Sequence, residues 1–112
     1  MKKRLDLTGK VALVVGAETA DGRKLAIALA EAGADVAVTG SGLQPGEEVA
    51  LHSCANEIWS LGRRGFAAPI DSSDPAQLEA LKRRVITELG RLDILVEAFE
   101  EGRGPDDATP TQ

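Results

Sequence analysis

Short apolar runs alternate with helical patterns along the chain, and this alternation restricts the fold more than any other feature. Four runs are bounded by glycine or charge and predict buried strands: residues 11–15, 35–39, 65–70 and 92–96. Between them, three segments carry apolar residues at helical spacing: residues 22–32, 45–61 and 75–89. Because the strands are almost continuously apolar, they indicate a parallel sheet covered on both faces. The sequence therefore predicts an α/β fold.

Right-handed connections favour the strand order 3-2-1-4 for the four predicted strands. Pro69 supports this order, because proline cannot donate to a strand ladder and so belongs on an edge, where the third strand lies. The first two helices then cover one face of the sheet and the third helix covers the other. One helix cannot cover four strands, so we expect exposed apolar side chains there, with self-association or a protein partner.

The predicted helices carry recognisable end signals. Asp74 is a candidate N-cap, followed by Pro75 at the first helical position. Pro45 is placed in the same way at the start of the second helix. Gly33 and Gly90 directly follow apolar helical segments and predict their C-terminal ends.

The distribution of charge divides the chain into a nearly neutral main part and an acidic C-terminal segment. The chain has 112 residues, enough for one domain, and a net charge of −5. Residues 1–96 carry 12 basic and 13 acidic side chains, whereas residues 97–112 carry one arginine against five acids. Since residues 102–112 are also rich in glycine and proline, we expect a disordered acidic tail there and a folded domain over residues 1–101.

Several classes of function are disfavoured by composition. There is no basic surplus to bind nucleic acid, and no apolar run long enough to cross a membrane. His52 and Cys54 are the single histidine and the single cysteine, too few for a typical metal site. A lone cysteine also excludes an internal disulfide, and we expect a reducing cytoplasmic location.

The segment most able to carry chemistry is the glycine-containing turn at residues 16–22, between the first strand and the first helix. Gly16 permits a tight turn there, and backbone N–H groups at a helix start can hold a pyrophosphate. The turn lacks the spacing and the Ser or Thr of a P-loop. It is a candidate dinucleotide site.

The chain resembles the opening of the short-chain dehydrogenases/reductases. The resemblance rests on residues 7–17, Gly22-Arg23, and residues 32–38, 70–75 and 90–96. It implies the N-terminal half of a three-layer Rossmann-like fold that binds NAD or NADP. The family's cofactor loop is Thr-Gly-x-x-x-Gly-x-Gly. Here Val15 replaces the Thr, Gly16 and Gly22 are kept, and Ala20 replaces the middle glycine.

The resemblance implies two further cofactor residues and one departure. Asp71 matches an aspartate that contacts the adenine, although capping before the third helix is an alternative role. The second strand should end near an acid that accepts the ribose hydroxyls of NAD, but Gly40-Ser41 stands there, and Ser41 is the candidate contact. The fourth strand should lead into Asn-Asn-Ala-Gly, whereas residues 97–100 read Glu-Ala-Phe-Glu.

Charge and chemistry both limit what the resemblance implies. Glu18 and Asp21 place carboxylates in the turn, which predicts weak or lost dinucleotide binding, with no preference between NAD and NADP. The family's Tyr-x-x-x-Lys moves the proton during hydride transfer, and this chain contains no tyrosine. We therefore expect a truncated or degenerate NAD(P)-binding domain without oxidoreductase activity alone. The alternative is a non-catalytic interaction module that docks on a partner or on itself.

Overall fold

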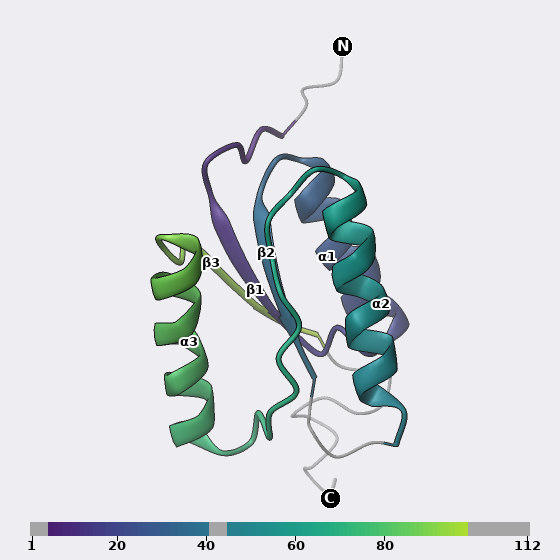
Figure 1. Ribbon diagram of the computed structural model, residues 1–112, viewed down its shortest axis with the longest axis vertical. Coiled ribbons are helices and arrows are strands. Elements are labelled where there is room, and N and C mark those ends of the chain that lie inside the picture. The colour runs from purple at the N-terminus through teal and green to yellow at the C-terminus, as the bar shows by residue number, and fades with distance from the viewer. Residues whose placement is uncertain (1–4, 41–44, 99–112) are drawn as a thin grey trace, which may run out of the picture.

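A parallel three-stranded sheet forms the centre of the molecule. The computed structural model describes residues 5–40 and 45–98. Its strands are β1 (Val11–Val15), β2 (Asp35–Thr39) and β3 (Ile94–Glu97), in the order β2-β1-β3. Its helices are α1 (Ala20–Glu31), α2 (Glu47–Ser60) and α3 (Pro75–Leu89). The predicted α/β class and parallel sheet are confirmed (Figure 1).

The prediction of a fourth regular strand at residues 65–70 is not confirmed among the described residues. This segment runs beside β2 on the expected edge, but it forms a single parallel bridge, between Val38 and Ala67. Val38 bonds to both sides of Ala67: its N–H donates to the Phe66 carbonyl at 2.9 Å, and its carbonyl accepts the Ala68 N–H at 3.0 Å. Residues 66 and 68 thus face β2 in this pairing, so the missing N–H of Pro69 lies on the outer side of the edge segment, where it interrupts no bond to β2. The predicted spatial order therefore holds, with an irregular segment at the edge.

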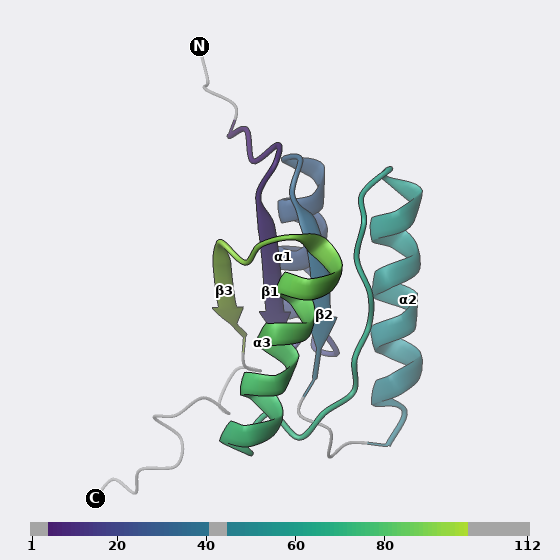
Figure 2. The same cartoon turned by 60° about the vertical axis from the view of Figure 1, so that its left-hand side comes forward.

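The two faces of the sheet are covered as the right-handed connections predict (Figures 1 and 2). On one face Ala12 and Val14 of β1 pack against α1 and α2. On the other, Val11 and Leu13 pack against α3. All five residues of β1 are buried, which explains its unbroken apolar sequence.

Apolar side chains are exposed in several places, and the face that α3 covers is one of them. The helix α3 covers the middle of its face, where Leu13 of the central strand β1 is completely buried. On this side of the molecule Leu95 of β3 is 43% exposed and Ile86 of α3 is 49% exposed, while Leu5, Val49, Trp59 and Leu61 are exposed elsewhere. Because Leu95 is paired with Leu13, it lies on the face that α3 covers. The expected exposure on this face is therefore found at Leu95, whereas Val11 and Leu13 on the same face are buried.

Helix ends follow the predicted signals with small shifts. Asp74 caps α3 by accepting the Ala76 N–H at 3.0 Å, and Gly90 ends the helix with a φ of 96°. The second helix begins two residues later than predicted, at Glu47, because Gly46 takes a left-handed conformation at its N-cap. Cys54 of α2 is completely buried, and this burial raises the pKa of its thiol.

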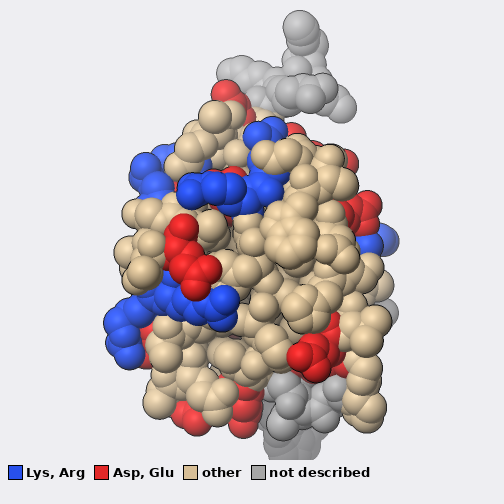
Figure 3. All heavy atoms as spheres, viewed as in Figure 1, with Lys and Arg blue, Asp and Glu red and all other residues tan. Residues whose placement is uncertain are grey.

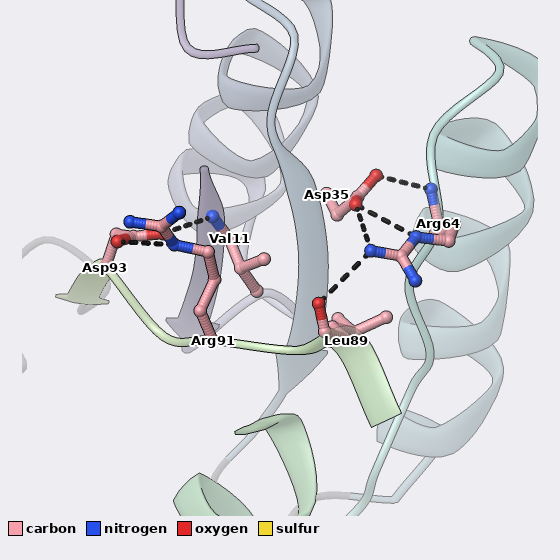
Figure 4. A network of polar contacts seen from close by, with 6 residues as sticks. All are labelled: Val11, Asp35, Arg64, Leu89, Arg91 and Asp93. Carbon is pink, nitrogen blue, oxygen red and sulfur yellow. Dashed lines mark hydrogen bonds and ion pairs between the residues drawn. The ribbon is translucent and has the colours of Figure 1, made fainter. Parts of the chain in front are cut away.

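A carboxylate joins two strands at their amino-terminal ends. Asp93, just before β3, accepts the Val11 N–H at 2.9 Å and pairs with Arg91 at 2.8 Å. Hydrogen bonds from Arg91 and from the Val11 backbone hold the pKa of Asp93 below its usual value. The side chain thus fixes the start of β1 against the start of β3 (Figure 4).

A second polar contact lies at the same end of the sheet. Asp35, the first residue of β2, accepts the Arg64 N–H at 2.8 Å and pairs with the Arg64 guanidinium at 2.9 Å. The same guanidinium donates to the Leu89 carbonyl at the end of α3, at 3.1 Å. Figure 4 shows both contacts. The amino-terminal edge is therefore fixed by ion pairs, while the carboxyl ends of the strands lie at the opposite edge.

Candidate functional site

A tight turn at the carboxyl end of β1 brings the start of α1 against the sheet. Gly16 has a φ of 94°, a conformation that strongly favours glycine. Its N–H and that of Ala17 both donate to the Thr39 carbonyl, at 2.8 and 3.1 Å. The turn is therefore fixed to the end of β2, and α1 begins at the carboxyl edge of the sheet.

Both glycines kept in the turn are required by close backbone packing. A Cβ on Gly16 would lie 2.0 Å from the Ala98 carbonyl oxygen, and a Cβ on Gly22 would lie 2.0 Å from that of Gly16. Real Cβ atoms essentially never approach other atoms so closely. Gly16 and Gly22 thus hold three backbone segments together at one point, and the fold alone requires both.

Thr19 caps the first helix, a role that the sequence interpretation missed. It is the N-cap of α1: its hydroxyl accepts the Gly22 N–H at 3.0 Å and donates to the Gly16 carbonyl at 2.7 Å. A threonine directly before a helical pattern is itself a capping signal, so the sequence did contain this information. Ala20 follows as the first helical residue and is exposed. The N–H groups of Ala20 and Asp21 have no acceptor within the helix and lie at its positive end.

Carboxylates gather around the end of β2 more closely than the sequence indicated. Glu47, the first residue of α2, is only 5% exposed. A Cβ on Gly40 would lie 2.4 Å from Glu47 Oε2 and 2.8 Å from Glu18 Oε1. The space next to Gly40 is therefore filled by carboxylates from the turn and from α2. No sequence pattern connects residues 18, 40 and 47, so this group emerged only with the structure.

Asp71 follows the edge segment and forms a local turn. Its Oδ1 accepts the N–H of Ser73 at 3.0 Å and the Ser73 hydroxyl at 2.6 Å, while its own N–H donates to Gln77. The helix cap itself is Asp74, so Asp71 does not cap α3. An open apolar groove beside it is lined by Ala68, Ile70, Gln77, Ala80, Leu81 and Arg84.

The structure brings some of the predicted site residues together and leaves others apart. Gly16, Ala20 and Gly22 form one turn at the carboxyl end of β1. Asp71 lies beyond the edge segment, with β2 between it and β1. Ser41 lies outside the described residues, as do residues 99 and 100. Glu97 ends β3 and is exposed.

Other kinds of site find little support in the part of the chain that the structure describes. No group of three or more His, Cys, Asp or Glu side chains is arranged there to hold a metal ion. Within residues 5–40 and 45–98, every helix is too short or too polar to span a bilayer. The face seen in Figure 3 mixes acidic and basic side chains and shows no single large basic patch.

Comparison with known proteins shows that this chain is similar to a large family. The family model described as short chain dehydrogenase matches residues 10–99. Cyclohexanol dehydrogenase from Rhodococcus sp. (strain TK6) is 36% identical over 103 residues, covering 86% of this chain and 38% of that protein. The 7alpha-hydroxysteroid dehydrogenase of Escherichia coli (strain K12) is 37% identical over 92 residues, covering 82% of this chain and 34% of that protein.

Solved structures agree with the sequence relatives. Carveol dehydrogenase from Mycobacterium avium, in complex with NAD, superposes with a TM-score of 0.77 at 31% identity, over 88% of this chain and 38% of that one. The chain thus spans little more than a third of the relatives it matches. On the sequence match, the glycine turn and the shared fold, the chain belongs to the short-chain dehydrogenase/reductase family.

Proposed function

We propose that this chain is a dinucleotide-binding domain whose site lies at the carboxyl ends of β1 and β2. The observation that carries the proposal is the start of α1, which Gly16 and Thr19 hold against the sheet with its first N–H groups at the strand ends. A helix start of this kind favours an anionic group such as a pyrophosphate. Among the related solved structures, carveol dehydrogenase from Mycobacterium avium is in complex with NAD and a 7alpha-hydroxysteroid dehydrogenase is in complex with NADH.

The residues present fit a dinucleotide, but two features lower the expected affinity for it. Gly16 and Gly22 keep the backbone compact at the turn, and Asp71 lies beside an apolar groove suited to one face of a base. The Ala20 methyl, however, stands where the family has a glycine, and Asp21 adds a negative charge in the first turn of α1. Binding of NAD or NADP in the millimolar range is part of the proposal.

Catalysis by this chain alone is not part of the proposed function. A bound nicotinamide would supply or accept a hydride, and a neighbouring acid or base must then move a proton. The family uses a tyrosine for this purpose, and these 112 residues include none. The role of the chain's own residues is therefore to bind and orient the dinucleotide. We also propose a cytoplasmic location, which suits a free buried thiol at Cys54.

Calorimetric titration with NAD and NADP, comparing wild type with Ala20→Gly, tests the proposed site. If Ala20 crowds a pyrophosphate, the variant binds about tenfold more tightly, which corresponds to about 1.4 kcal/mol. Ala28→Gly, on an exposed position of the same helix, is the matched control and leaves affinity unchanged. The site assignment fails if Ala20→Gly gains no affinity while both variants remain folded by circular dichroism.

A second candidate function is a non-catalytic interaction module. Leu95 on β3 and Ile86 on α3 are large apolar side chains that remain substantially exposed. Surface of this kind often contacts a partner. Sedimentation with and without NAD separates the two functions: a monomer that binds NAD supports the first, and a stable dimer that is unchanged by NAD supports the second.

A further inference from the structure

We infer that the adjacent arginines Arg63 and Arg64 act as a two-sided latch on the sheet, in which Arg64 controls the local opening of α3 and Arg63 controls the local opening of the C-terminal end of α1. The two helices lie on opposite faces of the sheet (Figures 1 and 2). This conformational device goes beyond the proposed function, because it uses no group of the glycine turn.

The segment that carries the two arginines runs beside β2, which explains how neighbouring residues reach different layers. The Arg64 carbonyl accepts the Val36 N–H at 3.0 Å. Successive side chains of an extended segment point to opposite faces of a sheet. The next residues show this alternation, because Phe66 packs in the apolar cluster under α3 and Ala67 packs in the cluster under α1 and α2. Arg63 and Arg64 therefore extend toward different helices.

On the α3 side, the Arg64 guanidinium joins the end of the helix to the start of β2. Its Nε donates to Asp35 Oδ2 at 3.0 Å, and its Nη2 donates to the Leu89 carbonyl at 3.1 Å (Figure 4). Leu89 is the last residue of α3, and the last turn of this helix holds no basic side chain. Because the Arg64 side chain is 63% exposed, its ion pair with Asp35 contributes little by itself and serves to orient the guanidinium. Arg64 thus supplies, from another element, the cation that favours a helix C-terminus.

On the opposite face, Arg63 has the same role for α1. Its Nε donates to the Ala30 carbonyl at 3.0 Å, in a partly buried contact. The last turn of α1 also lacks a basic side chain. The Ala30 carbonyl accepts the Gly33 N–H at 3.0 Å as well, so this helix end stays partly closed without the arginine. We therefore expect a smaller effect from Arg63 than from Arg64.

The helix α3 is the layer that depends most on the latch. Its buried residues are Leu81, Val85 and Leu89, whereas α1 and α2 together bury more side chains and also pack against each other. Regions with few buried apolar contacts open locally at a lower free energy than the whole protein unfolds. Opening of α3 would expose Val11 and Leu13 of β1, which pack in the cluster beneath it. The latch thus keeps an apolar surface covered that would otherwise favour association.

Native-state hydrogen exchange of the ¹⁵N-labelled chain, compared among wild type, Arg64→Gln and Arg83→Gln, tests the latch. For Arg64→Gln we expect the amides of Leu89 and Gly90, at the end of α3, to exchange about tenfold faster, with the amides of α1 unchanged. Arg83→Gln removes the same charge from an exposed position on α3 and is the matched control, with wild-type exchange at both amides.

Two further variants separate the geometry of the guanidinium from its charge and one side of the latch from the other. Arg64→Lys keeps the charge but has no planar fork to bond Asp35 and Leu89 together, so exchange should accelerate as in Arg64→Gln. Arg63→Gln should accelerate exchange of the Ala32 amide, at the end of α1, by about threefold and leave α3 at the wild-type rate.

Four results would overturn the inference. Equal acceleration in α1, α3 and β1 for Arg64→Gln would show a loss of global stability, and unchanged exchange at the end of α3 would show that the contact with Leu89 does not hold the helix. Wild-type exchange in Arg64→Lys would assign the effect to charge alone, and an unchanged end of α1 in Arg63→Gln would remove one side of the latch. Circular dichroism checks folding, and Arg64→Lys supplies the same test if Arg64→Gln does not fold.

Discussion

Glycine 22 shows how a single position can oppose a general rule of helix stability. It lies inside α1, where replacing glycine by alanine in an exposed site gains about 1 kcal/mol. Here the added methyl would overlap the Gly16 carbonyl oxygen, which is backbone and cannot turn away. Close packing between a helix start and a strand end therefore decides the residue.

Gly22→Ala is accordingly expected to destabilise the protein, by roughly 3 kcal/mol, the upper range for overpacking. The measurement is the free energy of unfolding from urea titration followed by the fluorescence of Trp59. Ala28→Gly on the exposed side of the same helix gives the ordinary cost of glycine, about 1 kcal/mol. A variant Gly22→Ala as stable as wild type would show that α1 and β1 are not packed as described.

The structural role of a residue could be predicted where that role depends only on its neighbours along the chain. Asp74 as a cap and Gly90 as a helix end follow from local chemistry, and the structure confirms both. The placement of Glu47 over Gly40 was not predictable, because it depends on the path of the chain between β2 and α2.

At the scale of elements, the edge of the sheet explains the difference between the expected and the observed strands. The hydrophobic pattern of residues 65–70 correctly indicated an extended segment beside β2. Apolar character places a segment against the core, and Pro69 suits the outer side of an edge, but neither feature determines whether the backbone keeps the regular geometry of a strand. The pattern therefore predicted the position of this segment and overestimated its regularity.

Asp93 connects two elements through an ionised carboxylate, and this makes the contact dependent on pH. Since its pKa is lowered in the folded protein, the contribution to stability is complete above the usual pKa of about 4 and is lost as pH falls through the lowered value. Asp93→Asn should therefore melt below wild type at pH 7, with a difference that shrinks toward pH 3.

Thermal melts at pH 7, 5 and 3 measure this effect. Glu31→Gln removes an exposed charge at the end of α1 and serves as the control, with a melting temperature close to that of wild type. A deficit in Asp93→Asn that stays constant from pH 7 to pH 3 would mean that the carboxylate charge does not fix β1 to β3.

For the molecule as a whole, the two ends of the parallel sheet differ in chemistry. The amino-terminal edge is joined by Asp93 with Arg91 and by Asp35 with Arg64 (Figure 4). The carboxyl edge holds the glycine turn, the start of α1 and the carboxylates around Gly40. One end is stabilised by its own ion pairs, and the other presents the groups that we propose contact a dinucleotide.

Backbone amide chemical shifts of the ¹⁵N-labelled chain, followed while NAD is added, test this division most directly. We expect the largest shifts at the carboxyl edge, in Ala20, Asp21 and Gly40, with Val11 and Arg64 at the amino-terminal edge unchanged. Saturable shifts confined to that carboxyl edge would support a dinucleotide site there. Shifts concentrated at the amino-terminal edge, or none at millimolar NAD, would contradict it.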